Sequence, residues 1–146
     1  MKARHCLRIL YAHYANIPHL TLNQTSSNMN IESIRDYCLS LPYTSEYLPF
    51  DETTLAFRVA DKIFAMIDDT EWFVLKCDPE YAVELRESHS EITGAWHMNK
   101  KHWNQINLYG MLSDELILSL IRHSYDLVLK KLPKKTRDQW LCKPNA

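Results

Sequence analysis

A row of β-prone residues in the middle of the chain most constrains its fold. The row consists of three runs, TTLAFRVA at residues 53–60, KIFAMID at 62–68 and WFVLKC at 72–77, which are rich in β-branched and aromatic residues. Only a few polar residues connect each run to the next. A parallel pair of strands needs a crossover of about a dozen residues or more. The three runs therefore predict consecutive antiparallel strands.

Three helices are predicted around these strands. Each one begins at a residue that commonly caps helices, and the second also has a proline at its first helical position. An apolar stripe of helical period follows each start signal, and a proline ends the first and the third stripe. The predicted helices span residues 30–41, 78–88 and 113–132.

Two more strands are predicted between the second and third helices. They are EITGAW at 91–96 and WNQINLY at 103–109, and HMNKKH links them. The resulting order is α-β-β-β-α-β-β-α. This order predicts an α+β fold in which an antiparallel sheet has helices packed on one face.

The first 28 residues differ from the rest of the chain. They contain basic residues and no acidic ones, and their apolar stretch is interrupted by Arg8 and His13 and is far short of a membrane span. We therefore expect residues 1–28 to be a poorly ordered leader or an extension upstream of a native start at Met29, with a cationic targeting sequence as the alternative. A single domain is expected over 29–140 and a tail over 141–146.

The sequence lacks the motifs that mark common cofactor sites. Gly94 and Gly110 are the two glycines, so no phosphate-cradling loop is predicted. His97 and His102 are five apart, a spacing that brings them together neither on a helix nor on a strand, so no metal site is predicted. The cysteines form no C-x-x-C pair and are typical of reduced thiols in a cytosolic protein. They are Cys6, Cys38, Cys77 and Cys142.

The distribution of charge along the sequence indicates that any nucleic-acid contact is made by a local surface, because the molecule as a whole is not basic. The net charge is −1, but lysines gather in the last third of the chain. In WHMNKKHWNQINL, residues 96–108, two lysines lie among aromatic and amide side chains that can contact phosphates and bases. The alternative is a turn into a strand with Trp103 as a core anchor. The candidate nucleic-acid contacts are Lys100, Lys101, His102, Trp103, Asn104, Lys130, Lys131, Lys134 and Lys135.

Four strings together resemble the MmcQ/YjbR family. They are LKCDPE at 75–80, HMNKKHW at 97–103, SYDLV at 124–128 and LPKK at 132–135. The resemblance covers about residues 29–137 and implies a start near Met29 and a fold similar to that of bacterial frataxin (CyaY). It also implies DNA binding, because family members commonly carry that label for a double-wing arrangement of sheet and loops.

The sequence departs from the family pattern at two turns. Where the family tends to have Gly-Gly before K-x-F-A, this chain has Ala60 and Asp61. The approach to His97, glycine-rich in the family, is Gly94-Ala95-Trp96. Both changes argue against a wing with a bare, flexible backbone and an uncharged tip.

The predicted function is weak DNA binding through phosphate contacts by a cytoplasmic protein that is not an enzyme and has no cofactor, metal or membrane partner. The alternative is a protein- or small-ligand-binding module. An enzyme would need a polar constellation with perturbed protonation, which the sequence does not display. Clustered late lysines would favour DNA, whereas a concave apolar pocket flanked by Tyr125 or Trp96 would favour the binding module.

Overall fold

The computed structural model describes residues 29–70 and 72–141 of the chain. The predicted leader, residues 1–28, lies outside the described residues. The chain divides into two compact units, of which one runs from Ser27 to Lys131 and contains the sheet. Helix α5, Lys134–Leu141, belongs to the other unit and is described by itself.

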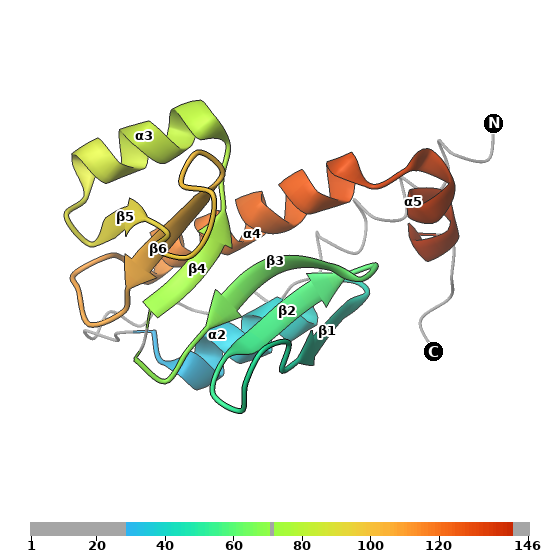
Figure 1. The fold of residues 1–146 in the computed structure, drawn as a ribbon, viewed down its shortest axis with the longest axis horizontal. Coiled ribbons are helices and arrows are strands. Elements are labelled where there is room, and N and C mark those ends of the chain that lie inside the picture. The colour runs from blue at the N-terminus through green and yellow to red at the C-terminus, as the bar shows by residue number, and fades with distance from the viewer. Residues whose placement is uncertain (1–28, 71, 142–146) are drawn as a thin grey trace. The chain divides into compact units, whose positions relative to one another are not determined.

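Six strands form one antiparallel sheet in the order β1-β2-β3-β4-β6-β5 (Figure 1). The fold class predicted from the sequence is confirmed, and strand β1 is an addition to the predicted order. The strands are β1 Thr44–Tyr47, β2 Leu55–Val59, β3 Lys62–Ile67, β4 Trp72–Lys76, β5 Ile92–Gly94 and β6 Trp103–Asn107.

Helices α2 (Ile31–Ser40), α3 (Pro79–Ser88) and α4 (Asp114–Lys131) pack on the same face of the sheet and share one hydrophobic core. Their start signals act as predicted. The Asn30 side chain accepts a hydrogen bond from the Ser33 N–H (2.8 Å), and the Asp78 carboxylate accepts one from Glu80 N–H (3.1 Å). No helix among the described residues is long and apolar enough to cross a membrane.

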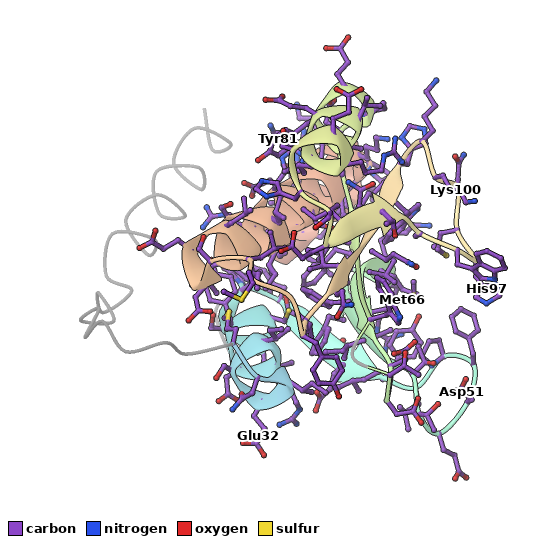
Figure 2. All side chains as sticks on the ribbon, turned by 90° about the vertical axis from the view of Figure 1, so that its left-hand side faces the viewer. Glu32, Asp51, Met66, Tyr81, His97 and Lys100 are labelled. Carbon is purple, nitrogen blue, oxygen red and sulfur yellow. The ribbon has the colours of Figure 1, made fainter. Side chains whose placement is uncertain are left out.

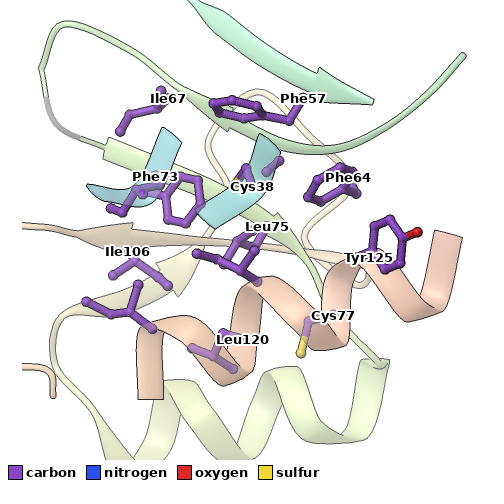
Figure 3. Packing of buried hydrophobic residues seen from close by; sticks show 14 of the residues in the cluster. Cys38, Phe57, Phe64, Ile67, Phe73, Leu75, Cys77, Ile106, Leu120 and Tyr125 are labelled. Atoms are coloured by element: carbon purple, nitrogen blue, oxygen red, sulfur yellow. The ribbon is translucent and has the colours of Figure 1, made fainter. Parts of the chain in front are cut away.

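The core lies between the sheet and the helices (Figure 3). Phe57, Phe64 and Phe73 point from the strands toward the helices and are completely buried, as is Tyr125 from α4. The Tyr125 ring meets the Phe64 ring edge to face, with 5.5 Å between centroids. Because this face is apolar and covered, the opposite face of the sheet is the one left open.

Strand β3 contains a β-bulge at Phe64. The β2–β3 register shifts by one residue so that Phe64 has no partner in β2, and the β3–β4 pairing stops at Ala65 opposite Leu75. In that register Phe64 and Lys76 would be the next pair. The Ser124 hydroxyl of α4 instead accepts from the Lys76 N–H (2.9 Å) and donates to the Phe64 carbonyl (2.5 Å). A helix side chain thus continues the ladder where the strands separate.

The hairpin between β2 and β3 turns through two residues with left-handed backbone. Ala60 has φ 47° and Asp61 has φ 63°, at the turn where the sequence departs from the Gly-Gly of the family pattern. The Asp61 carboxylate lies 3.5 Å from the Arg58 guanidinium. The tip is therefore charged and occupied by side chains, in agreement with the departure noted in the sequence.

Candidate functional site: a trough on the open face

The open face of the sheet is hollowed by a trough with a volume of about 710 Å³. Figure 2 shows its position: Asp51 and His97 project on the side of the sheet away from α2 and α4, with Met66 between them. A volume of this size suits a small organic ligand. The trough is lined by Phe50, Asp51, Thr54, Met66, Ile67, Asp68, Trp72, Val74, Ala95, Trp96, His97, Met98 and Gln105.

One rim is the loop between β1 and β2. The Asp51 carboxylate accepts hydrogen bonds from the backbone N–H groups of Thr53 (2.9 Å) and Thr54 (2.6 Å), which fixes the turn. These bonds favour the charged form and lower the pKa of Asp51. Phe50, immediately before this turn, is 73% exposed. The loop thus holds a large apolar ring in solvent beside a carboxylate.

The opposite rim is the chain segment after β5. The Trp96 N–H donates to Oε1 of Gln105 (3.1 Å), and the Ala95 N–H donates to the Trp103 carbonyl (3.0 Å), so this segment is tied to β6. Trp96 is also 73% exposed, and its ring meets the His97 ring edge to face. Two exposed aromatic rings therefore flank the trough from loops far apart in sequence.

The floor consists of sheet side chains and the turn between β3 and β4. Met66 is buried, whereas Trp72 and Val74 are partly exposed toward the trough; the Ile67 side chain, opposite Phe73, belongs to the core on the other face. Asp68 accepts from the Trp72 N–H (3.3 Å), which orders the turn. The floor is mostly apolar, with the Gln105 amide on β6 and a second carboxylate, Asp68, at this end.

The lysines of the predicted nucleic-acid site lie on several elements: the turn before β6, the end of α4 and helix α5. Lys100 and Lys101 are exposed in the turn before β6, where Lys100 Nζ lies 5.8 Å from the Trp96 ring centroid. Trp103 is partly exposed on β6, with Lys76 Nζ at 5.6 Å from its ring centroid. His102 uses its backbone carbonyl to accept from the Cys77 N–H (2.8 Å).

The remaining predicted contacts lie elsewhere in the chain. Asn104 is 3% exposed and its amide donates to the Ala82 carbonyl (3.3 Å), so its side chain lies on the helix-covered face and not with the lysines. Lys130 and Lys131 are exposed at the end of α4, and Lys134 and Lys135 are exposed in α5 of the other unit.

The described cysteines belong to the core. Cys38 and Cys77 are buried free thiols, and burial raises the pKa of Cys38 to about 12 and that of Cys77 to about 11. Burial therefore disfavours the thiolate, which is the nucleophilic form of cysteine. Among the residues that the structure describes, no group of three or more His, Cys, Asp and Glu side chains is placed to hold a metal ion.

Three of the strings that carry the family resemblance meet at the end of β4. LKCDPE contributes the backbone N–H groups of Lys76, Cys77 and Asp78, which donate to Ser124, to the carbonyl of His102 and to Nε2 of His123. Of these acceptors, His102 belongs to HMNKKHW, Ser124 is the first residue of SYDLV, and His123 directly precedes it. The strings are therefore structural, because together they join β4, β6, α3 and α4.

His123 makes the stability of this junction depend on pH. Its Nε2 accepts from the Asp78 N–H (3.1 Å), which requires the neutral ring. Burial is the main cause that lowers the pKa of His123, and the charge of Lys130 lowers it further, whereas Asp78 and Asp126 raise it. The Tyr81 ring packs edge-on against the imidazole, with 5.3 Å between the ring centroids. A lowered folded-state pKa means that the unfolded chain binds more protons, so stability is full above about pH 6.5 and falls below it.

We expect the free energy of unfolding of His123→Gln to depend less on pH than that of the native chain between pH 7.5 and 5. Gln keeps an acceptor for the Asp78 N–H but does not titrate. Urea unfolding at several pH values measures the free energy of unfolding of both proteins. The difference between their pH dependences is the contribution of His123, because the two proteins share all other histidines. Parallel curves for the two proteins would contradict the assignment.

The stretch WHMNKKHWNQINL, singled out in the sequence as a contact surface, contributes Trp96, His97, Met98 and Gln105 to the trough, but the sequence did not indicate the other lining residues. Phe50, Asp51 and Asp68 lie in loops, and only the fold brings those loops to one side of the sheet. The available signal was the alternation of side chains in β4 and β6, which places Trp72, Val74 and Gln105 on the same face.

Comparison with known proteins gives one family. The family model described as YjbR matches residues 39–127. The protein YjbR of Escherichia coli strain K12 is 33% identical over 112 residues, which span 75% of this chain and 95% of that protein. YbdF of Escherichia coli O157:H7 is 30% identical over 116 residues, 77% of this chain and 93% of that protein.

Solved structures with similar sequences have the same fold as this chain. The crystal structure of Deinococcus radiodurans protein DR2400, described as a DUF419 domain, matches with a TM-score of 0.73 and 36% identity, covering 84% of this chain and 95% of that one. A crystal structure of a Pseudomonas syringae protein matches with a TM-score of 0.61 and 30% identity, covering 68% and 98%. The fold described above is thus also found in related chains.

Proposed function

The chain belongs to the YjbR family, as its sequence strings predicted, and from that premise we propose that it is a non-enzymatic binding protein whose trough holds a flat, apolar small ligand. The observation that carries the proposal is the pair of exposed rings, Phe50 and Trp96, on opposite rims of a 710 Å³ cavity. Large aromatic side chains exposed around a concave apolar surface are typical of a binding site.

The arrangement of the trough supports this proposal in two further ways. Both rims are fixed by hydrogen bonds, through Asp51 on one side and Gln105 on the other, so little ordering is needed when a ligand binds. The floor offers thioether and aliphatic groups from Met66 and Val74, which adapt to an apolar surface.

The proposal is tested with Nile red, a neutral, flat dye whose fluorescence rises in apolar surroundings. We expect saturable binding to the full chain, weakened about tenfold by Phe50→Ala and by Trp96→Ala, because an aromatic contact contributes about 1 kcal/mol beyond the area that it buries. The matched control is Tyr109→Ala, since Tyr109 is 72% exposed and does not line the trough. Equal weakening by Tyr109→Ala, or no binding, would contradict the proposal.

A second candidate function is weak nucleic-acid binding by the same side of the sheet. Its supporting observation is that Lys100 lies over Trp96 and Lys76 over Trp103, which pairs a cation with a ring at two places. Such pairs can contact phosphates and stack on exposed bases. Against it, the trough itself carries Asp51 and Asp68, which repel phosphates.

Fluorescence anisotropy of labelled single-stranded and duplex DNA at several salt concentrations tests this candidate. Binding that weakens steeply with salt and is lost in Lys100→Glu/Lys101→Glu would support it. Lys134→Glu/Lys135→Glu changes the charge equally in α5 and separates the two groups of lysines. If the native chain does not bind at low salt, the nucleic-acid candidate fails.

A further inference from the structure

We propose that the ligand of the trough carries a positive charge on its flat apolar body. This inference rests on the proposed function and names the class of ligand. Its basis is the charge of the lining: two carboxylates, Asp51 and Asp68, face the trough, and none of the described residues that line it is lysine or arginine. An apolar ligand with a cationic group complements such a surface, whereas an anionic ligand is repelled.

The two carboxylates lie in different connections of the sheet, and each is next to apolar residues that line the trough. Asp51 lies next to the exposed ring of Phe50, and Asp68 comes directly after the end of β3, two residues from the floor residue Met66. The Asp68 carboxylate accepts hydrogen bonds through Oδ1, from the N–H groups of Thr70 (2.9 Å) and Trp72 (3.3 Å) and from the Thr70 hydroxyl (2.5 Å). Oδ2 is the oxygen that we assign to the ligand.

The aromatic lining favours the same kind of ligand. Phe50, Trp72 and Trp96 present three rings to the trough, and the face of an aromatic ring attracts a cation. The chain already uses this interaction nearby, because Lys100 Nζ lies 5.8 Å from the Trp96 ring centroid. Lys100 itself does not line the trough, so the rings of Phe50 and Trp72 and the two carboxylates remain directed at the ligand.

The charge of the ligand is tested with three bicyclic aromatic probes of similar size: N-methylquinolinium as the cation, quinoline as the neutral molecule at pH 7.5, and naphthoate as the anion. Isothermal titration calorimetry measures the affinities for the full chain, and the indole N–H signals in NMR spectra report binding at tryptophan. We expect the cation to bind about tenfold more tightly than the neutral probe and the anion to bind most weakly.

Variants of the protein then show which carboxylate of the trough causes the preference for the cation. Asp51→Asn and Asp68→Asn keep an oxygen that accepts the loop hydrogen bonds and remove the charge. Each is expected to reduce the ratio of the affinity for N-methylquinolinium to the affinity for quinoline several-fold. Asp69→Asn is the matched control, because Asp69 is the exposed neighbour of Asp68 and does not line the trough.

The outcomes separate the two proposals. Equal affinity for the three probes, or a preference for naphthoate, would overturn the charged ligand and leave the trough as a binding site. An equal effect of Asp69→Asn and Asp68→Asn would overturn it as well, since the preference would then come from net charge alone. Failure of all three probes to bind would count against the trough itself.

Discussion

Ser124→Ala is expected to destabilise the protein by about 2–4 kcal/mol. The hydroxyl of Ser124 is completely buried and joins the Lys76 N–H to the Phe64 carbonyl at the point where the β3–β4 ladder stops. Alanine leaves both backbone groups without this partner, and an unsatisfied buried polar group costs about 1–3 kcal/mol. The Phe64 bulge and the position of α4 depend on the same bridge, so the loss is not local to one strand.

Urea unfolding of the native chain and the variant measures this effect. Ser119→Ala is the control, because Ser119 lies in the same helix, is exposed, and donates only to the Leu116 carbonyl within its own helix (2.8 Å). We expect it to change the free energy of unfolding by less than about 0.5 kcal/mol. A loss of similar size in both variants would show that the bridge adds nothing beyond helix propensity.

Helix starts and the three central strands could be predicted from the sequence because their signals are local. The capping side chain of Asp78 and the proline after it have the same roles in an isolated peptide as in the fold. The alternation of the buried Phe73 and Leu75 with partly exposed neighbours likewise determines which face of β4 is buried.

Strand β1 was not predicted because its stability comes from tertiary contacts. Its sequence, TSEY, has a weak β pattern. Glu46 forms an ion pair with Arg35 of α2, and the Arg58 guanidinium lies 4.3 Å from the centroid of the Tyr47 ring. Both arginines lie outside the strand in the sequence, so the pattern of residues within β1 does not predict these contacts.

Helix α5 was not predicted because one residue has two roles. Pro133 signals the end of the preceding helix, but its carbonyl also accepts the first hydrogen bond of the next, from Arg137 N–H (2.9 Å). A proline lacks only an N–H group, which is not needed where a helix begins. Pro133 was therefore interpreted only as the end of α4, although it also precedes the start of α5.

The candidate site was the least predictable part of the molecule. The stretch around Lys100 attracted attention because charge and aromatic residues are adjacent in sequence. The trough joins Phe50 and Asp68 to Trp96 across three separate segments, which only the strand order β3-β4-β6 and the loops at its edges bring together. Composition alone contains no information about such proximity.

Tyr125 combines the two kinds of core contact, and its variants are expected to separate them. Tyr125→Ala should cost about 3–5 kcal/mol, because it removes a completely buried ring and its edge contact with Phe64. Tyr125→Phe keeps the ring and loses the hydrogen bond to the Pro42 carbonyl (2.8 Å), so about 1 kcal/mol is expected. Chemical unfolding of both variants measures the difference. If Phe were as damaging as Ala, the hydroxyl that ties α4 to the segment after α2, and not the packing of the ring, would be the main contribution of this residue to stability.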